Sequence, residues 1–238
     1  MQLNIAHFYP DLLNLYGDKG NIISLQKRCQ WRNIDVNVTS YNINDKVDFS
    51  NIDIVFIGGG SDREQLIVCQ RLLELKYEIK NYVETNGVLL AICGGYQLIG
   101  NYYQLNDDKI EGLGLVDIYT IQKPGRLIGN VVLETRFGSI VGFENHGGRT
   151  YFNDKNLSPF GAVLCGNGNN GEDQLEGIIY KNLIGTYLHG PLLPKNPKLT
   201  DEVIKRALER KYGETIELSL LDDYEEDIAH KYILSKYR

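Results

Sequence analysis

The chain has 238 residues, 42% hydrophobic and 24% charged, so it can bury a full core and its composition excludes a disordered protein. With 25 Lys and Arg against 31 Asp and Glu, the formal net charge is -6, and no basic stripe exists that could follow a phosphate backbone, which argues against nucleic acid as a partner. No signal-peptide pattern and no run near the ~20 apolar residues that span a bilayer are present, so we expect a cytoplasmic protein without membrane insertion.

The first sixty residues alternate strand, loop and helix. Apolar or alternating runs predict strands at residues 3–8, 34–41 and 52–57. The first strand leads through a Gly- and Pro-containing loop into a helix from about Asn21, and the third stops at three glycines, residues 58–60.

The same alternation continues to residue 100. Apolar residues at helical spacing predict an amphipathic helix over residues 63–86, with Gly87 at its C-terminal cap. The apolar run at residues 88–92 predicts a buried strand that turns, through two glycines, into a helix from Tyr96. Parallel neighbours need crossovers, so this order predicts a mostly parallel central sheet with helices on both faces.

The pattern becomes β-rich after Gly100. Strands are expected at residues 114–121, 127–133, 139–143, 177–180 and 183–187, and two helices, near 199–211 and 222–237, close the chain. We find no repeat and no long linker, so we expect an α/β fold in which residues 1–238 form one domain with a β-rich C-terminal half.

Cys93 is the strongest candidate for chemistry. The four cysteines are dispersed without a C-x-x-C pair, which indicates neither a disulfide framework nor a metal site. Cys93 lies where a buried strand turns into a helix, the geometry of a nucleophile elbow, and the backbone N–H of Gly94 could face an oxyanion. The alternative is that Cys93 is a small buried hydrophobe.

A cysteine nucleophile needs a base, and the chain has four histidines. His189 ends a strand and is followed by Gly190 and Pro191, which would expose its imidazole at a sheet end. His146 is the competitor, whereas His7 within a strand and His230 on a terminal helix are better explained by packing or solvation.

Two further features fit the same site. The glycines at residues 58–60 should open at the same sheet edge as Cys93, where an N–H, such as that of Gly59, could complete an oxyanion hole. Their sequence matches neither nucleotide-binding glycine motif, so ATP is not expected on this chain. Arg126, at a turn-to-strand boundary, suits a substrate carboxylate, and the alternative is that it is a solvent-facing cation.

Together these motifs resemble the class I glutamine amidotransferases, in which a Gly-rich oxyanion strand, an elbow cysteine and a strand-end histidine follow in this order. The usual members carry a glutamate two residues after the histidine, but this chain has Pro191 there. The Thr-Tyr-Leu-His-Gly run at residues 186–190 is similar to the cobyric-acid-synthase-type subgroup, which lacks that glutamate.

Within the subgroup, residues 9–21, 126–130 and 142–146 resemble the small glutaminase subunits of lipid II isoglutaminyl synthases. The resemblance implies Cys93 and His189 as the catalytic pair and Arg126 as the glutamine-binding residue. It also implies a separate Mur-ligase-like synthetase subunit that binds ATP and lipid II, and a product in which the α-carboxylate of D-glutamate in the peptidoglycan stem peptide has become D-isoglutamine. No cofactor or metal is expected on this chain.

Several questions stay open at this stage. The group that orients His189 could be Asp18, Glu144 or a carboxylate of the partner. The alternatives to lipid II amidation are ammonia supply for a corrinoid amidation, a cysteine peptidase or related hydrolase on the same scaffold, and a non-catalytic binding subunit. Corrinoid enzymes of this type usually carry a fused synthetase domain, for which the chain has no room.

Overall fold

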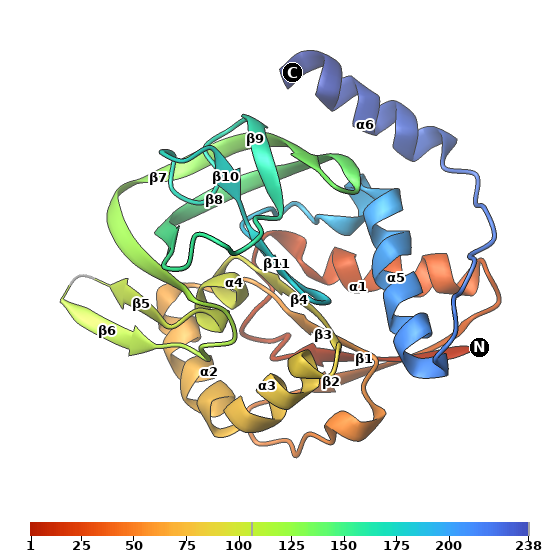
Figure 1. Cartoon of the computed structure of the whole chain (residues 1–238), viewed down its shortest axis with the longest axis horizontal. Helices are drawn as coiled ribbons and strands as arrows, with labels where there is room; N and C mark the ends of the chain where they lie inside the picture. The colour runs from red at the N-terminus through yellow and green to blue at the C-terminus, as the bar shows by residue number, and fades with distance from the viewer. Residues whose placement is uncertain (106, 238) are drawn as a thin grey trace.

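Two β-sheets organise the computed structural model, which describes residues 1–105 and 107–237 (Figure 1). The first sheet has the order β11-β12-β4-β3-β1-β2, with β11 antiparallel and the remaining strands parallel. Its strands are β1 (Gln2–Phe8), β2 (Asp35–Tyr41), β3 (Ile54–Ile57), β4 (Val88–Ile92), β11 (Ile178–Tyr180) and β12 (Leu183–Thr186). The central strands β3 and β4 are fully buried apolar runs, as expected where helices cover both faces of a parallel sheet.

Helices α1 and α5 lie on one face of this sheet, and α2, α3 and α4 lie on the other (Figure 1). The chain moves from β1 to β2 in one direction along the sheet and from β3 to β4 in the other, so right-handed crossovers put their helices on opposite faces. The helices are α1 (Lys19–Gln30), α2 (Asp62–Glu74), α3 (Lys76–Glu84), α4 (Gly94–Ile99) and α5 (Pro197–Tyr212).

The prediction of a single helix over residues 63–86 is wrong, since the chain forms two helices there. Leu75, between α2 and α3, leaves helical geometry with φ -96° and ψ 7°, and its side chain stays buried. Helix α2 begins at a capping interaction, in which the Ser61 N–H donates to Glu64 Oε2 at 2.7 Å.

The second sheet has the order β10-β9-β7-β5-β6, and β8 pairs with β7. Its strands are β5 (Tyr102–Leu105), β6 (Asp108–Glu111), β7 (Ile118–Thr135), β8 (Gly138–Phe152), β9 (Gly161–Cys165) and β10 (Leu175–Glu176). The two strands expected over residues 114–121 and 127–133 are one long bent strand, β7, whose register against β8 shifts between Gln122 and Leu127.

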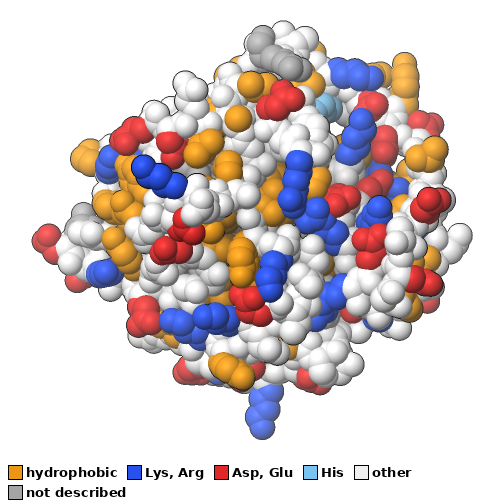
Figure 2. All heavy atoms as spheres, in the orientation of Figure 1, with side chains coloured by type: hydrophobic (Ala, Val, Ile, Leu, Met, Phe, Trp, Pro, Cys, Tyr) orange, Lys and Arg blue, Asp and Glu red, His pale blue; other side chains and the backbone are white. Residues whose placement is uncertain are grey.

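One hydrophobic cluster runs through both sheets, from Leu3 in β1 to Leu133 in β7. The α/β class, with a mostly parallel central sheet and a β-rich second half, is therefore confirmed. Acidic and basic side chains are interspersed over the face in Figure 2. Among the described residues, none of the helices combines the length and the apolar composition that a membrane span requires.

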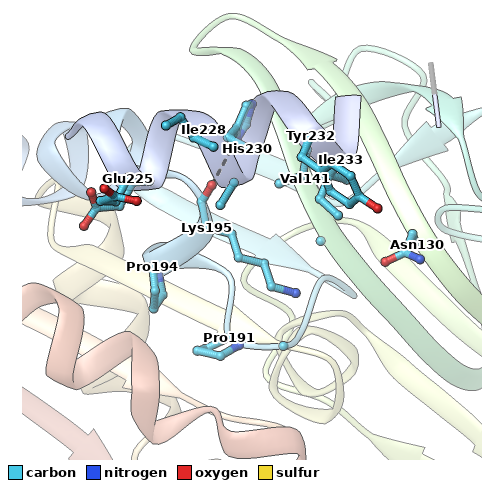
Figure 3. A pocket seen from close by; sticks show the side chains of 14 residues that line it. Asn130, Val141, Pro191, Pro194, Lys195, Glu225, Ile228, His230, Tyr232 and Ile233 are labelled. Carbon is cyan, nitrogen blue, oxygen red and sulfur yellow. Dashed lines mark hydrogen bonds between the residues drawn. The ribbon is translucent and has the colours of Figure 1, made fainter. Parts of the chain in front are cut away.

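The last helix, α6 (Tyr224–Tyr237), lies beside β7, β8 and the short 3₁₀ helix η3 (Leu193–Lys195) (Figure 1). None of its described side chains is buried. A cavity of about 710 Å³ lies between this helix and the body, lined by Ile228 and Tyr232 of α6 and by Val141 and Pro194 of the body (Figure 3).

Candidate active site

Cys93 lies at the turn between β4 and α4. Its φ of +50° and ψ of -103° are strained for a residue with a side chain, and such strain is held in place by surrounding structure. Here the Cys93 N–H donates to the Thr186 carbonyl at 2.8 Å, which ties the turn to β12. A side chain on Gly95 would place its Cβ 2.6 Å from the Ile57 carbonyl, so the turn requires glycine there.

His189 reaches the same place from the end of β12. Its backbone is fixed by a bridge to β8, in which the His189 N–H donates to the Phe143 carbonyl at 2.8 Å. A Cβ built on Gly59 would lie 3.0 Å from His189 Cε1 and 3.2 Å from Cys93 Cβ, so both side chains converge over this glycine. The loops after β3, β4 and β12 therefore meet at the carboxyl edge of the parallel sheet.

Asp18 contacts the imidazole of His189. Its Oδ1 lies 3.3 Å from His189 Nδ1, and its Oδ2 accepts the N–H of Gly59 at 2.8 Å, with both side chains completely buried. Of the two carboxylates named from the sequence, Asp18 is thus the one that contacts His189. Glu144 accepts from the N–H groups of Asn167 and Gly168, at 2.8 and 2.9 Å, and serves a different loop.

The electrostatics of the site favour a protonated His189. Burial disfavours the charged imidazole, but the negative charge of Cys93 and the hydrogen bonds to Asp18 and Cys93 outweigh it, and the pKa of His189 is raised to about 10. A protonated histidine beside a cysteine is the pairing that activates a thiolate for nucleophilic attack.

His146, the competing base, is held differently. Its ring stacks on Tyr187, with centroids 3.5 Å apart and planes 4° apart, and its Nδ1 lies 2.7 Å from the Gly148 carbonyl. Burial lowers the pKa of His146, although Glu144 and Gly148 oppose the shift. His146 therefore lines the site as a neutral side chain. The two other histidines lie elsewhere, His7 buried in β1 and His230 on α6.

A cavity of about 250 Å³ opens over Cys93 and brings the second sheet into the site. Arg126 of β7 lines it, and its guanidinium donates to the side-chain and backbone oxygens of Asn145, both at 2.7 Å. This holds the fork of Arg126 in place while leaving it exposed, as suits a ligand carboxylate. Cys93 and Arg126, predicted from separate motifs, thus lie in one cavity, whereas the larger cavity beneath α6 contains neither.

The two predicted oxyanion donors differ. Gly94 follows Cys93 directly, and none of the described hydrogen bonds uses its N–H. The Gly59 N–H is already occupied by Asp18 Oδ2. Gly94 and Gly59 as oxyanion donors stay predictions, and the second would require Asp18 to release the N–H.

Gln65 belongs to the site but was not predicted. Its side chain is buried, lines the cavity, and donates from Nε2 to the Gly60 carbonyl at 3.1 Å. A Cβ on Gly94 would lie 2.8 Å from the same nitrogen, so Gln65 fills the space between the Gly-rich loop and the elbow. A glutamine one turn into an amphipathic helix carries no sequence signal that would reveal this.

Within residues 1–105 and 107–237, no group of three or more His, Cys, Asp and Glu side chains is arranged to bind a metal.

Comparison with known proteins agrees with this geometry. The model of the CobB/CobQ-like glutamine amidotransferase domain matches residues 4–197. The chain is 50% identical over 235 residues to the GatD subunit of a glutamine-hydrolysing lipid II isoglutaminyl synthase from Staphylococcus aureus, covering 98% of this chain and 95% of the relative. It is 43% identical to the corresponding Streptococcus pneumoniae subunit, covering 97% and 90%. The fold is similar to that of a glutamine amidotransferase from Thermotoga maritima, with a TM-score of 0.53 at 16% identity, covering 98% of this chain and 95% of that one.

Proposed function

This chain belongs to the CobB/CobQ-like glutamine amidotransferase family, and we propose that it is the glutaminase subunit of a lipid II isoglutaminyl synthase. In this role it hydrolyses glutamine to glutamate and ammonia, and the ammonia amidates the D-glutamate α-carboxylate of lipid II. The observation that carries the proposal is the convergence of Cys93 and His189 over Gly59, at a cavity that also contains Arg126.

The geometry supports a thioester mechanism. Glutamine binds with its α-carboxylate on Arg126 and its carboxamide over Cys93. The Cys93 thiolate forms a C–S bond to the carboxamide carbon, and the oxygen becomes an oxyanion facing the Gly94 N–H. His189 gives its proton to the departing nitrogen, the C–N bond breaks, and ammonia leaves.

The second half of the cycle hydrolyses the thioester and restores the starting state of Cys93 and His189. His189, now neutral, takes a proton from water, and the resulting hydroxide attacks the thioester carbon. The C–S bond breaks, glutamate is released, and the proton on His189 again faces the Cys93 thiolate. Every proton transfer uses side chains of this chain, so we propose that the glutaminase step needs no metal or cofactor.

A partner completes the proposed reaction. The S. aureus and S. pneumoniae relatives are named as subunits of a synthase, which supports a second chain that activates the acceptor carboxylate. We propose a Mur-ligase-like synthetase that binds ATP, with both chains in the cytoplasm. A corrinoid amidation is the second candidate, favoured by the match to the CobB/CobQ-like domain, but both cited relatives are named as subunits of lipid II enzymes.

The test is glutamate release from glutamine by the wild-type chain and by Cys93→Ala, each alone and co-expressed with a Mur-ligase-like protein. We expect Cys93-dependent release that rises with the partner, together with amidation of lipid II by the pair. Cys165→Ala, a half-buried cysteine of β9, is the matched control and should release glutamate normally. Absence of release from a verified complex would refute the glutaminase, and release without lipid II amidation would redirect the assignment to another acceptor.

A further inference from the structure

We propose that Asp18 is the positioning residue of this site, because its two oxygens couple the base His189 to the glycine loop beside Cys93. The inference rests on the proposed function, since it assigns a role in glutamine hydrolysis. It adds a residue of the β1–α1 segment to the glycine loop, the cysteine and the histidine that follow β3, β4 and β12.

The β1–α1 segment forms hydrogen bonds to both backbone polar groups of Gly59, in the glycine loop after β3. The Gly59 N–H donates to Asp18 Oδ2 at 2.8 Å, and the Gly59 carbonyl accepts from the Leu15 N–H at 3.0 Å. A Cβ on Gly58 would lie 2.2 Å from the Leu13 carbonyl, so the segment packs directly on the loop. Both hydrogen bonds fix the orientation of the same residue, Gly59, at the centre of the site.

Asp18 itself is fixed by its neighbours. It follows the 3₁₀ helix η1 (Leu15–Gly17) and precedes α1, with its N–H donating to the Leu15 carbonyl at 3.3 Å and its carbonyl accepting from the Asn21 N–H at 2.9 Å. The side chain has no exposed surface, so its charge must be compensated inside the protein. The Gly59 N–H and the His189 imidazole provide that compensation.

This arrangement defines the state of the base. A carboxylate can only accept, so His189 donates from Nδ1, and its Nε2 is left for Cys93. The Gly59 N–H cannot donate to Asp18 and to an oxyanion at once. A loop movement that frees this N–H would therefore change the contact that orients the base, and Asp18 links the two events.

Few other titratable groups lie close enough to His189 to affect its titration. Cys93 faces His189, while Tyr103 and Tyr187 interact with Cys93, and burial raises the pKa of both phenols. His7, on β1, is lowered to a pKa of about 4, mainly by burial, and stays neutral above that pH. Lys19, the residue after Asp18, is exposed.

The test compares Asp18→Asn with Asp18→Glu in the full chain, alone and with its synthetase. We expect Asp18→Asn to lower kcat for glutamate release about 100-fold with KM within about threefold, since the substrate cavity is untouched. The pH at which His189 titrates, followed by NMR, should fall by about one unit or more, because an opposite charge is lost. Asp18→Glu should restore part of both. The matched control is Asp11→Asn, an exposed carboxylate of the same segment, which should change neither.

An unchanged kcat and an unchanged His189 titration in folded Asp18→Asn would overturn the proposal. If that variant does not fold, the wild-type chain labelled with ¹⁵N-histidine decides. A slowly exchanging Nδ1–H that disappears in His189→Gln supports the coupling, and its absence refutes it. A wild-type chain that releases no glutamate with its partner would refute the proposed function instead, while the His189 titration would still test Asp18.

Discussion

The two sheets contribute to the site in different ways. In the proposed mechanism, the parallel sheet supplies the reacting and orienting groups from loops at its carboxyl edge, with Cys93 after β4 and His189 after β12. The second sheet supplies Arg126 from the bend of a long hairpin. This division implies that changes in the first sheet should act on the chemical step and changes in the second on substrate binding.

The largest expected effect is that of His189→Gln. Without the proton donor and acceptor, kcat for glutamate release should fall about 1,000-fold, while KM changes little because the cavity residues remain. Steady-state glutamate release by the complex measures both constants, and thermal unfolding reports whether the variant is folded. A raised KM with an unchanged kcat would contradict the division between the sheets.

Arg126→Ala tests the other half. Loss of a charge-assisted contact to the glutamine α-carboxylate should raise KM about 100-fold and leave kcat within a few-fold. The same kinetic assay applies, with Lys123→Ala as control, since Lys123 is an exposed cation of the same strand that pairs with Glu172. If Arg126→Ala lowered kcat and spared KM, the second sheet would have to take part in the chemical step.

The sequence predicts the parallel sheet well because its signals are local. Apolar runs that end in glycine mark β3 and β4, and the turn at Cys93 is visible from the residues on both sides of it. The convergence of Cys93, His189 and Arg126 also follows, since strand ends of one sheet meet at one edge and the family resemblance adds Arg126.

Contacts between distant segments are less predictable. Asp18 and Glu144 are both acidic residues near motifs, and only the packing of the β1–α1 segment against the Gly-rich loop decides between them. Pro124 and Gly125 lie at the bend in β7, in the interval that separates the two strands predicted from the sequence. Local sequence shows that such residues interrupt regular pairing, but it does not show that β8 pairs on both sides of the interruption.

Glu176 lies where the two sheets meet. It belongs to β10 of the second sheet, and its Oε1 accepts from Thr186 Oγ1 at 2.6 Å and from the Tyr187 N–H at 2.7 Å, both in the chain that leads to His189. Burial raises the pKa of Glu176 to about 7, although these hydrogen bonds oppose the shift. Its Oε2 is buried and has no hydrogen-bond partner among the described residues, so a negative charge on the carboxyl group would be only partly compensated.

The smallest predicted effect is that of Glu176 on the pH dependence of stability. Because the folded chain binds this proton more tightly than the unfolded chain, the group stabilises most below its ordinary pKa, and its contribution is lost as the pH rises through about 7. Between pH 5 and 7 the loss should be about 2 kcal/mol. Glu176→Gln cannot ionise, so the free energy of unfolding of the variant, relative to wild type, should rise by that amount over this range in denaturant titrations. Glu172 is an exposed acid four residues away. The free energy of unfolding of Glu172→Gln should therefore depend on pH between 5 and 7 in the same way as that of the wild type. If Glu176→Gln also ran parallel, the carboxyl group would be charged at the junction of the sheets, and a counter-charge would have to reach it there.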